Sequence, residues 1–418
     1  MARVSRRTPL YALYVADTIS LAGNAVAQIA IPWFVLATTG SATLTALAVF
    51  FNFLPIVLAA FFGGVVVDRL GFRATSIVAD LASSAAVAAI PLLDVTVGIE
   101  IWQLMLLVFV GALLDAPGAT ARAALFPDVV ELAEVRMEQA SGLRSAIQQG
   151  AQLIGAPLGG VLVAAFGGTD ALWLDSVSFL VSAGLVAGLV PRPQARPEHE
   201  AARGRFLTEL AEGLAFIWTR PLVRAVVAMV LLTNLIEAPG TVVLAVFSKD
   251  VYGSAADFGL LVGVLGGAAL AGALGYSAIG HRLPRRRTFL VCFAFVPVGY
   301  IALAAQPSLP VAIAALAVGG LASGPINPLL FTVMTEIVPT ELRGRAFGAV
   351  RGGAWAAIPL GILVGGAVVA AIGAPATFLV MGVLLAAVVG YGFLNPTFRD
   401  MDLRDDVASA QSVSDGTS

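Results

Sequence analysis

A few acidic, basic and amide residues lie inside long apolar stretches of this sequence, and these groups could bind a proton or a polar ligand. Asp17, Asn24 and Gln28 are separated by seven and four residues, so they share one face of a helix. Glu237 has no basic residue within two helical turns. A charged side chain in an apolar span costs roughly 2.5–3.5 kcal/mol on insertion scales, so each one requires a function or a partner. Glu237, Asp17 and Asp115 are our candidates, in that order, for a carboxyl group that carries a proton.

A second polar stripe is formed by Arg144, Gln148 and Gln152, which are spaced by four residues. Such stripes either line a water-filled cavity or form hydrogen bonds between helices, and the latter are common and modest in energy. For the stripes that contain Asp17 and Arg144 we favour the cavity. The side chains expected to line it are Asn24, Gln28, Trp33, Asn52, Gln148, Gln152 and Asn234.

Other charged residues in the apolar stretches have a structural explanation. Asp115 and Arg122 are seven residues apart on one helix face, and an ion pair explains them at least as well as a role in transport. The same holds for Asp80. For Asp175, which shares a face with Ser178 near the outer end of its stretch, we favour the structural explanation.

The composition indicates the class of protein. Of the 418 residues, 59% are hydrophobic and 12% are charged, whereas soluble proteins have roughly 45–50% apolar and about 25% charged residues. Apolar runs of about 20 residues, long enough to cross the hydrocarbon core, recur along the chain. We therefore predict a polytopic α-helical membrane protein. The sequence contains no phosphate-binding loop, metal-ligand cluster or catalytic triad, so we expect no enzymatic activity, cofactor or metal.

Twelve spans are predicted from the apolar runs. Their ranges are 10–37, 43–66, 74–95, 101–122, 139–166, 171–190, 221–247, 257–280, 288–305, 310–334, 346–371 and 375–395. When the connections are numbered alternately, the arginines fall on or near one side and Lys249 alone falls on the other. Because Lys and Arg are enriched in cytoplasmic loops, both termini are predicted to lie in the cytoplasm.

A polar linker divides the chain into two halves of six spans. We expect six-helix bundles at 1–190 and 221–395, a cytoplasmic linker with an interfacial helix at 191–220, and a disordered cytoplasmic tail at 396–418. DRLGFRAT at 68–75 aligns with HRLPRRRT at 281–288, which indicates that the halves are parallel repeats. Transporters with such repeats hold their substrate between the halves, near the middle of the membrane.

The turn between the second and third spans carries a charged motif, GVVVDRLGFR. Its residues Gly64, Asp68, Arg69, Gly71 and Arg73 resemble the loop motif of the major facilitator superfamily. The stretch GAPLGG at 155–160 is similar to the antiporter motif of the fifth span, although Ala156 stands where that motif has proline. The motif residues are Gly155, Pro157, Gly159 and Gly160.

Further stretches narrow this resemblance to the drug:proton antiporter-3 branch, which includes macrolide-efflux and Tap-type multidrug pumps. They include GNAVAQIAIPWFVLATTGSAT, PGATARAALFPDVV and PTELRGRAFG, and the resemblance covers nearly the whole chain. It implies the twelve-helix major facilitator fold and proton-coupled export of amphipathic drugs. It also implies that Asp68 clamps the halves on the cytoplasmic side by pairing with Arg351 or a helix N-terminus, and Arg69 is expected to pair with Asp128.

The expected partners are membrane lipid, protons and a small amphipathic substrate, with no nucleic acid, and the protein is expected to function as a monomer in a bacterial cytoplasmic membrane. Two alternatives remain open. One is a transporter of a single physiological solute such as a siderophore or a sugar. The other is a membrane scaffold or sensor that does not transport, which an intact loop motif and two polar stripes disfavour.

The predicted topology can be tested by labelling single cysteines in a Cys292→Ser background. Cysteines at Gly168 and Lys249 should react with an impermeant reagent from outside, and cysteines at His199 and His281 should react from the cytoplasm. Labelling of position 199 from outside would overturn the twelve-span topology.

The loop motif is predicted to control the conformational cycle and not substrate binding. Asp68→Asn should leave expression and ligand affinity near those of the unaltered protein, while the transport rate falls at least tenfold. Transport at the unaltered rate would mean that the charges of the loop only orient the spans.

Overall fold

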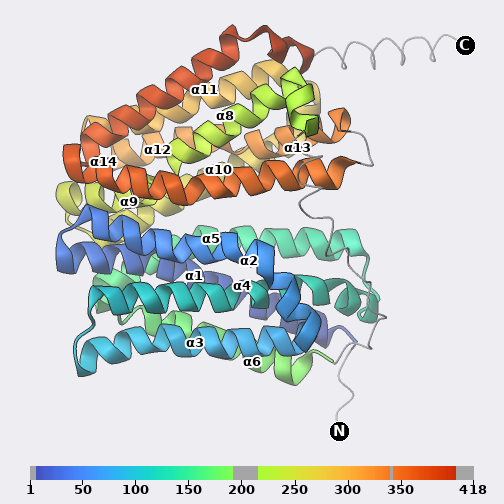
Figure 1. Ribbon diagram of the computed structural model, residues 1–418, viewed down its shortest axis with the longest axis vertical. Coiled ribbons are helices and arrows are strands. Elements are labelled where there is room, and N and C mark those ends of the chain that lie inside the picture. The colour runs from blue at the N-terminus through green and yellow to red at the C-terminus, as the bar shows by residue number, and fades with distance from the viewer. Residues whose placement is uncertain (1–5, 192–214, 339–341, 402–418) are drawn as a thin grey trace, which may run out of the picture. The chain divides into compact units, whose positions relative to one another are not determined.

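The computed structural model describes residues 6–191, 215–338 and 342–401, apart from the side chains of 59–69, 343–344, 351 and 400. The described residues form helices and connecting turns, which confirms the predicted all-helical class (Figure 1). Ten helices in this part of the chain are long and apolar enough to cross a membrane.

The first half of the chain forms six long helices, drawn in Figure 1 as rods that lie side by side. Their bounds are α1 (Thr8–Thr39), α2 (Ala42–Leu70), α3 (Phe72–Thr96), α4 (Ile101–Leu132), α5 (Met137–Phe166) and α6 (Leu172–Leu189). The second half contains more helices because several predicted spans are interrupted. They are α8 (Pro221–Glu237), α9 (Gly240–Phe247), a π-helix η1 (Ser248–Tyr252), α10 (Ala255–Ile279), a short η2 (Gly280–Arg282), α11 (Arg285–Ala304), α12 (Leu309–Ser323), α13 (Ile326–Ile337), α14 (Arg343–Leu394) and η4 (Pro396–Met401).

The chain divides into two compact units that do not follow the halves of the sequence. Unit 1 contains Met1–Pro197, Pro239–Gly263 and Ile362–Ala371, and unit 2 contains Glu198–Ala238, Val264–Gly361 and Ile372–Ser418. The domain boundaries predicted at residues 190, 220 and 395 stay predictions. Most of the predicted interfacial helix lies outside the described residues. Residues 215–219, which belong to the predicted linker and are described, are helical.

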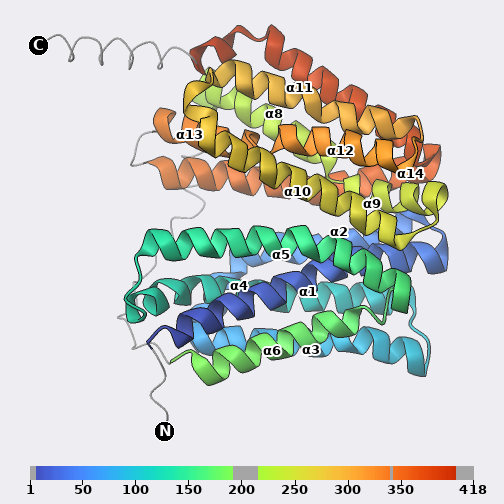
Figure 2. The same cartoon turned by 180° about the vertical axis from the view of Figure 1, so that it is seen from behind.

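Helix α1 is the centre of unit 1. It packs against α5 and α6 and also contacts α2, α4 and α9, and it is the most buried of the span-length helices. Figure 2 shows α1 flanked by α5 and α6. The polar side chains of Asp17 and Ser20 on α1 are therefore buried among neighbouring helices.

Small residues of the fifth-span motif let helices approach α5 closely on two sides. A Cβ at Gly159 would lie 3.0 Å from the Cα of Val26 on α1, and a Cβ at Gly160 would lie 2.9 Å from the Cα of Gly259 on α10. Gly155 lies against Ala25 in the same way. Larger side chains would push these helices apart.

Unit 2 has an apolar core of its own. Met229 of α8 and Phe293 of α11 belong to one buried cluster with Phe398 of η4. The rings of Phe289 and Phe398 stack with their centroids 6.0 Å apart. The prediction of a disordered tail is therefore wrong for residues 396–401, because Phe398 is buried and anchors a short helix; residues 402–418 lie outside the described part.

The turn that carries the charged motif is shorter than predicted. Helix α2 runs to Leu70 and α3 begins at Phe72, so Asp68 and Arg69 lie in the last turn of α2 and not in a loop. Gly71 alone reverses the chain, with φ 77° and ψ 152°, a conformation that strongly favours glycine. Gly64 lies within α2. The side chains of Asp68, Arg69 and Arg351 are outside those that the structure describes.

Proline and glycine account for the other differences from the predicted spans. The predicted span 221–247 breaks between α8 and α9 at Pro239, and the span 310–334 breaks between α12 and α13 at Pro325. The last two predicted spans lie on the two sides of Gly373 within α14, where φ 76° and ψ 166° are not helical, so α14 consists of two helices that meet at this glycine.

Candidate functional site

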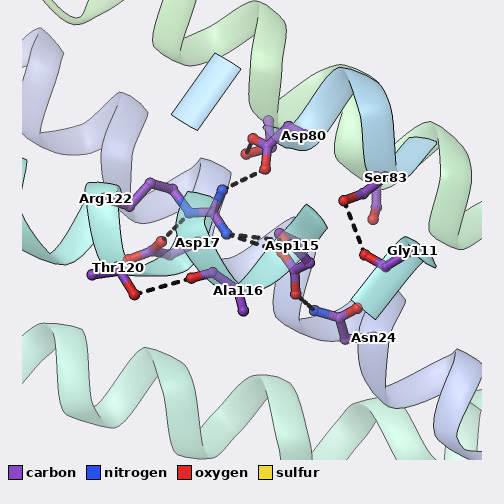
Figure 3. A network of polar contacts seen from close by, with 12 residues as sticks. Asp17, Asn24, Asp80, Ser83, Gly111, Asp115, Ala116, Thr120 and Arg122 are labelled. Atoms are coloured by element: carbon purple, nitrogen blue, oxygen red, sulfur yellow. Dashed lines mark hydrogen bonds and ion pairs between the residues drawn. The ribbon is translucent and has the colours of Figure 1, made fainter. Parts of the chain in front are cut away.

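A buried arginine organises the polar residues of unit 1. The side chain of Arg122 on α4 is only 4% exposed. Its Nε lies 3.0 Å from Oδ1 of Asp17 on α1, and its Nη1 lies 2.6 Å from Oδ1 of Asp80 on α3. Its Nη2 is 3.8 Å from Oδ1 of Asp115 on its own helix. Figure 3 shows the guanidinium surrounded by these three carboxylates.

A second guanidinium reaches the same cluster from α5. Nη2 of Arg144 lies 3.0 Å from Oδ2 of Asp17, whose other oxygen is bonded to Arg122. The Arg144 guanidinium also lies over the ring of Phe126, 4.8 Å from its centroid, an arrangement in which the face of the ring attracts the cation. The carboxylate of Asp17 therefore bridges two arginines, and it joins the two predicted polar stripes.

Neutral groups complete the hydrogen bonds of the carboxylates. Ser182 of α6 donates to Oδ2 of Asp80 at 2.6 Å. The amide of Asn24 donates to Oδ2 of Asp115 at 3.1 Å, as Figure 3 also shows. The cluster thus involves α1, α3, α4, α5 and α6. We call Asp17, Asp80, Asp115, Arg122 and Arg144 the Arg122 cluster.

The charges of the Arg122 cluster do not cancel when every group is ionised. Three carboxylates face two guanidiniums, which leaves one negative charge in excess. An uncompensated charge away from water is costly. The cluster is therefore suited to bind one proton or one further cation.

Asp17 and Asp115, two of the three predicted proton carriers, belong to this cluster. Glu237, the third, lies at the end of α8 in unit 2, where the hydroxyl of Tyr300 on α11 donates to its Oε1 at 3.3 Å. Both α8 and α11 belong to the part of unit 2 that holds its apolar core. Glu237 therefore belongs to unit 2 and the Arg122 cluster to unit 1, and the roles proposed for these residues stay predictions.

Three of the predicted cavity residues occupy other places. Gln28 of α1 and Asn52 of α2 line a small pocket together with Thr241 of α9, among apolar side chains that include Phe53. Trp33 stacks on Phe258 with ring centroids 6.2 Å apart.

The remaining predicted residues are found at these positions. Gln148 is half-buried and Gln152 is exposed on α5, and Asn234 is half-buried on α8. Of the motif residues, Arg73 donates from Nε to the carbonyl of Val190 at 2.7 Å and also bonds the carbonyl of Ala187. It therefore ties the start of α3 to the end of α6. Asp128 lies within α4.

Sequence reasoning missed several partners. Thr241, Ser182 and Tyr300 are ordinary residues in apolar stretches, and no spacing signals Thr241 or Tyr300. A stripe analysis of α6 could have found Ser182, because it lies four residues after Ser178 and seven after Asp175.

Comparison with known proteins identifies relatives over the whole chain. Residues 5–415 match a family described as transmembrane secretion effector. The chain is 31% identical over 404 residues to the multidrug efflux pump Tap of Mycobacterium tuberculosis, covering 96% of each protein. It is 22% identical over 408 residues to macrolide efflux protein A of Streptococcus pyogenes, covering 94% of this chain and 97% of that protein.

Solved structures share the fold at low sequence identity. The nucleoside transporter NupG superposes with a TM-score of 0.73 at 12% identity, covering 92% of this chain and 99% of that one. The D-xylose-proton symporter superposes with a TM-score of 0.66 at 14% identity, covering 94% and 97%. These matches show the major facilitator fold, as the loop motif predicted.

The Arg122 cluster should contribute strongly to stability. Arg122→Gln leaves three carboxylates facing one guanidinium, and breaking a buried ion pair from one side costs about 3–5 kcal/mol. We expect the detergent-solubilised variant to unfold at a clearly lower temperature than the unaltered protein.

The matched control for this variant is Arg136→Gln. Arg136 forms an ion pair with Glu138 at 3.6 Å, with both side chains 76% exposed, and exposed pairs contribute little. Equal unfolding temperatures for the two variants would show that the buried contacts do not hold the helices together.

Proposed function

Because the chain belongs to the transmembrane secretion effector family of major facilitator transporters, we propose that it exports amphipathic drugs across the bacterial cytoplasmic membrane in exchange for protons. Members of this family are transporters and not enzymes. The relative named as a multidrug efflux pump matches over nearly its full length, which supports drugs as the substrate class.

The observation that carries the proposed coupling is the excess of carboxylates in the Arg122 cluster. Neutralising one carboxylate with a proton balances the buried charge. Asp17 is the most connected member, because its two oxygens bond different arginines on different helices. A change in its protonation would loosen α1 from α4 and α5 together, and such a contact can couple proton binding to movement.

We also propose the twelve-span topology with both termini in the cytoplasm. Ten helices in the described residues are long enough to span, and Arg345–Leu394 among them is broken at Gly373. The shorter apolar helix Ala42–Leu58 is part of α2. When the two parts of the broken helix are counted separately and α2 is added, the ten helices become the twelve spans that we predict from the sequence.

A second candidate is transport of an uncharged polar solute. The pocket formed by Gln28, Asn52 and Thr241 offers amides and a hydroxyl, and its other lining residues among those described are apolar. Amides and hydroxyls can form hydrogen bonds with the hydroxyl or carbonyl groups of an uncharged solute, and they can also lie against a cation. Uptake assays with a lipophilic cation and with an uncharged sugar, in the same vesicles, separate the two candidates.

Inverted membrane vesicles with a pH-sensitive dye test the coupling. Uphill export needs an energy source, and the sequence contains no phosphate-binding loop that would indicate ATP hydrolysis. Each proton that moves down 100 mV of membrane potential supplies about 2.3 kcal/mol. Asp17→Asn and Glu237→Gln fix neutral forms of similar shape. We expect at least one of them to reduce drug-dependent proton flux and uphill export more than tenfold, while downhill drug exchange persists.

Asp170→Asn is the control, since Asp170 is an exposed acid outside the helices. This variant should retain full coupling. Undiminished coupled flux in both Asp17→Asn and Glu237→Gln would remove these residues as carriers and leave Asp115 as the remaining candidate. Undiminished flux in Asp115→Asn as well would refute the proposed coupling groups.

A further inference from the structure

A fourth buried carboxyl lies in unit 1 outside the Arg122 cluster. Asp175 stands in the first turn of α6 and is only 2% exposed. Helix α6 packs against α1 and α3, and both views show α3 and α6 next to each other (Figures 1 and 2). Asp175 is therefore enclosed near the end of α6 that the topology places toward the outside.

The described residues provide no cation for this carboxyl. Its side-chain contact is with Ser178, one turn along the same helix. From α1 it meets the backbone at Gly23, where a Cβ would lie 2.5 Å from Oδ1 of Asp175. The ion pairs found in the described part of the chain do not include Asp175. A buried, unpaired carboxylate is much less stable than the neutral acid.

Ser178 does not replace the missing cation. Its hydroxyl donates to the backbone carbonyl of Asp175 at 2.6 Å and, over a longer distance, to Oδ1 of Asp175 at 3.5 Å. A serine hydroxyl has one hydrogen, so the short bond to the carbonyl leaves little for the carboxylate.

A stripe of buried polar residues connects Asp175 with the Arg122 cluster. Asp175, Ser178 and Ser182 are spaced three and four residues apart on one face of α6, and all are buried. Ser182 donates to Asp80 at 2.6 Å, and Asp80 bonds Arg122. Asp175 therefore shares a face of α6 with the serine that bonds Asp80.

The polar groups on the helices packed against α6 already have partners of their own. On α3, Asp80 bonds Arg122 and accepts from Ser182. On α1, Asp17 bonds Arg122 and Arg144, and Asn24, beside Gly23, donates to Asp115 of α4. None of these contacts brings a cation to Asp175 in the described part of the chain.

We propose that Asp175 is an additional proton carrier of this transporter, which takes up a proton from the outer side and releases it during the transport cycle. In the reaction a carboxylate oxygen of Asp175 binds a proton from water, and the same O–H bond breaks on release. This inference rests on the proposed exchange of drug for protons. It assigns a second protonation site to the first six helices, distinct from the Arg122 cluster.

Infrared difference spectroscopy on the purified protein at two pH values tests for a titrating acid without any drug. Asp175→Asn should remove one carbonyl band of a protonated carboxyl, and Asp170→Asn should leave every band in place. Because asparagine has nearly the shape of the neutral acid, Asp175→Asn is expected to fold, and an unchanged unfolding temperature verifies this. A full set of bands in Asp175→Asn would overturn the proposal.

Proton release on addition of tetraphenylphosphonium, measured with a pH dye in detergent, tests for the exchange itself. Asp175→Asn should release one proton fewer per protein than the unaltered chain and Asp170→Asn. Equal release from all three overturns the role of Asp175 and leaves the proposed function intact. If the unaltered protein exports the cation without any proton movement, the proposed exchange fails and this inference fails with it. Loss of the carbonyl band in Asp175→Asn would then mean that Asp175 holds a fixed structural proton.

Discussion

A guanidinium buried in a membrane protein must be neutralised, and that constraint determines the arrangement of the first six helices. Arg122 bonds carboxylates on α1 and α3 and lies near a third on its own helix. Each carboxylate is in turn held by a second group, Arg144, Ser182 or Asn24. Removing Arg122 would leave Asp80 and Asp115 without the ion pairs they have in the described residues, so electrostatics as well as packing fix these helices relative to one another.

Close backbone contact makes these short ion pairs possible. Gly155 and Gly159 allow α5 to lie against α1, which brings Arg144 within reach of Asp17 from the other end of the same helix. A bulkier side chain at either glycine would separate α5 from α1 and lengthen that ion pair. The fifth-span motif thus acts on the charges through helix distance, although none of its residues is polar.

The sequence predicts the helices and their polar faces well, but not the partners of the charged groups. The spacing of Asp17 and Asn24, or of Arg144 and Gln148, shows which side chains share a face of one helix. It does not show how that helix is rotated toward its neighbours, and this rotation decides that Asp17 meets Arg144 and Arg122. Breaks at Pro239 and Pro325 and the one-residue turn at Gly71 were missed for a related reason. The apolar pattern continues through them, whereas the backbone does not.

The balance of buried charge links the stability of the fold to the proposed exchange. The same five groups that hold α1, α3, α4 and α5 together carry one carboxylate too many. A rigid structural cluster would be more stable with equal numbers of both charges, because each unpaired charge away from water is costly. The excess fits the exchange we propose, in which the cluster alternates between a protonated and an ionised form. In that proposal each form favours a different set of helix contacts, and proton binding would then move the helices.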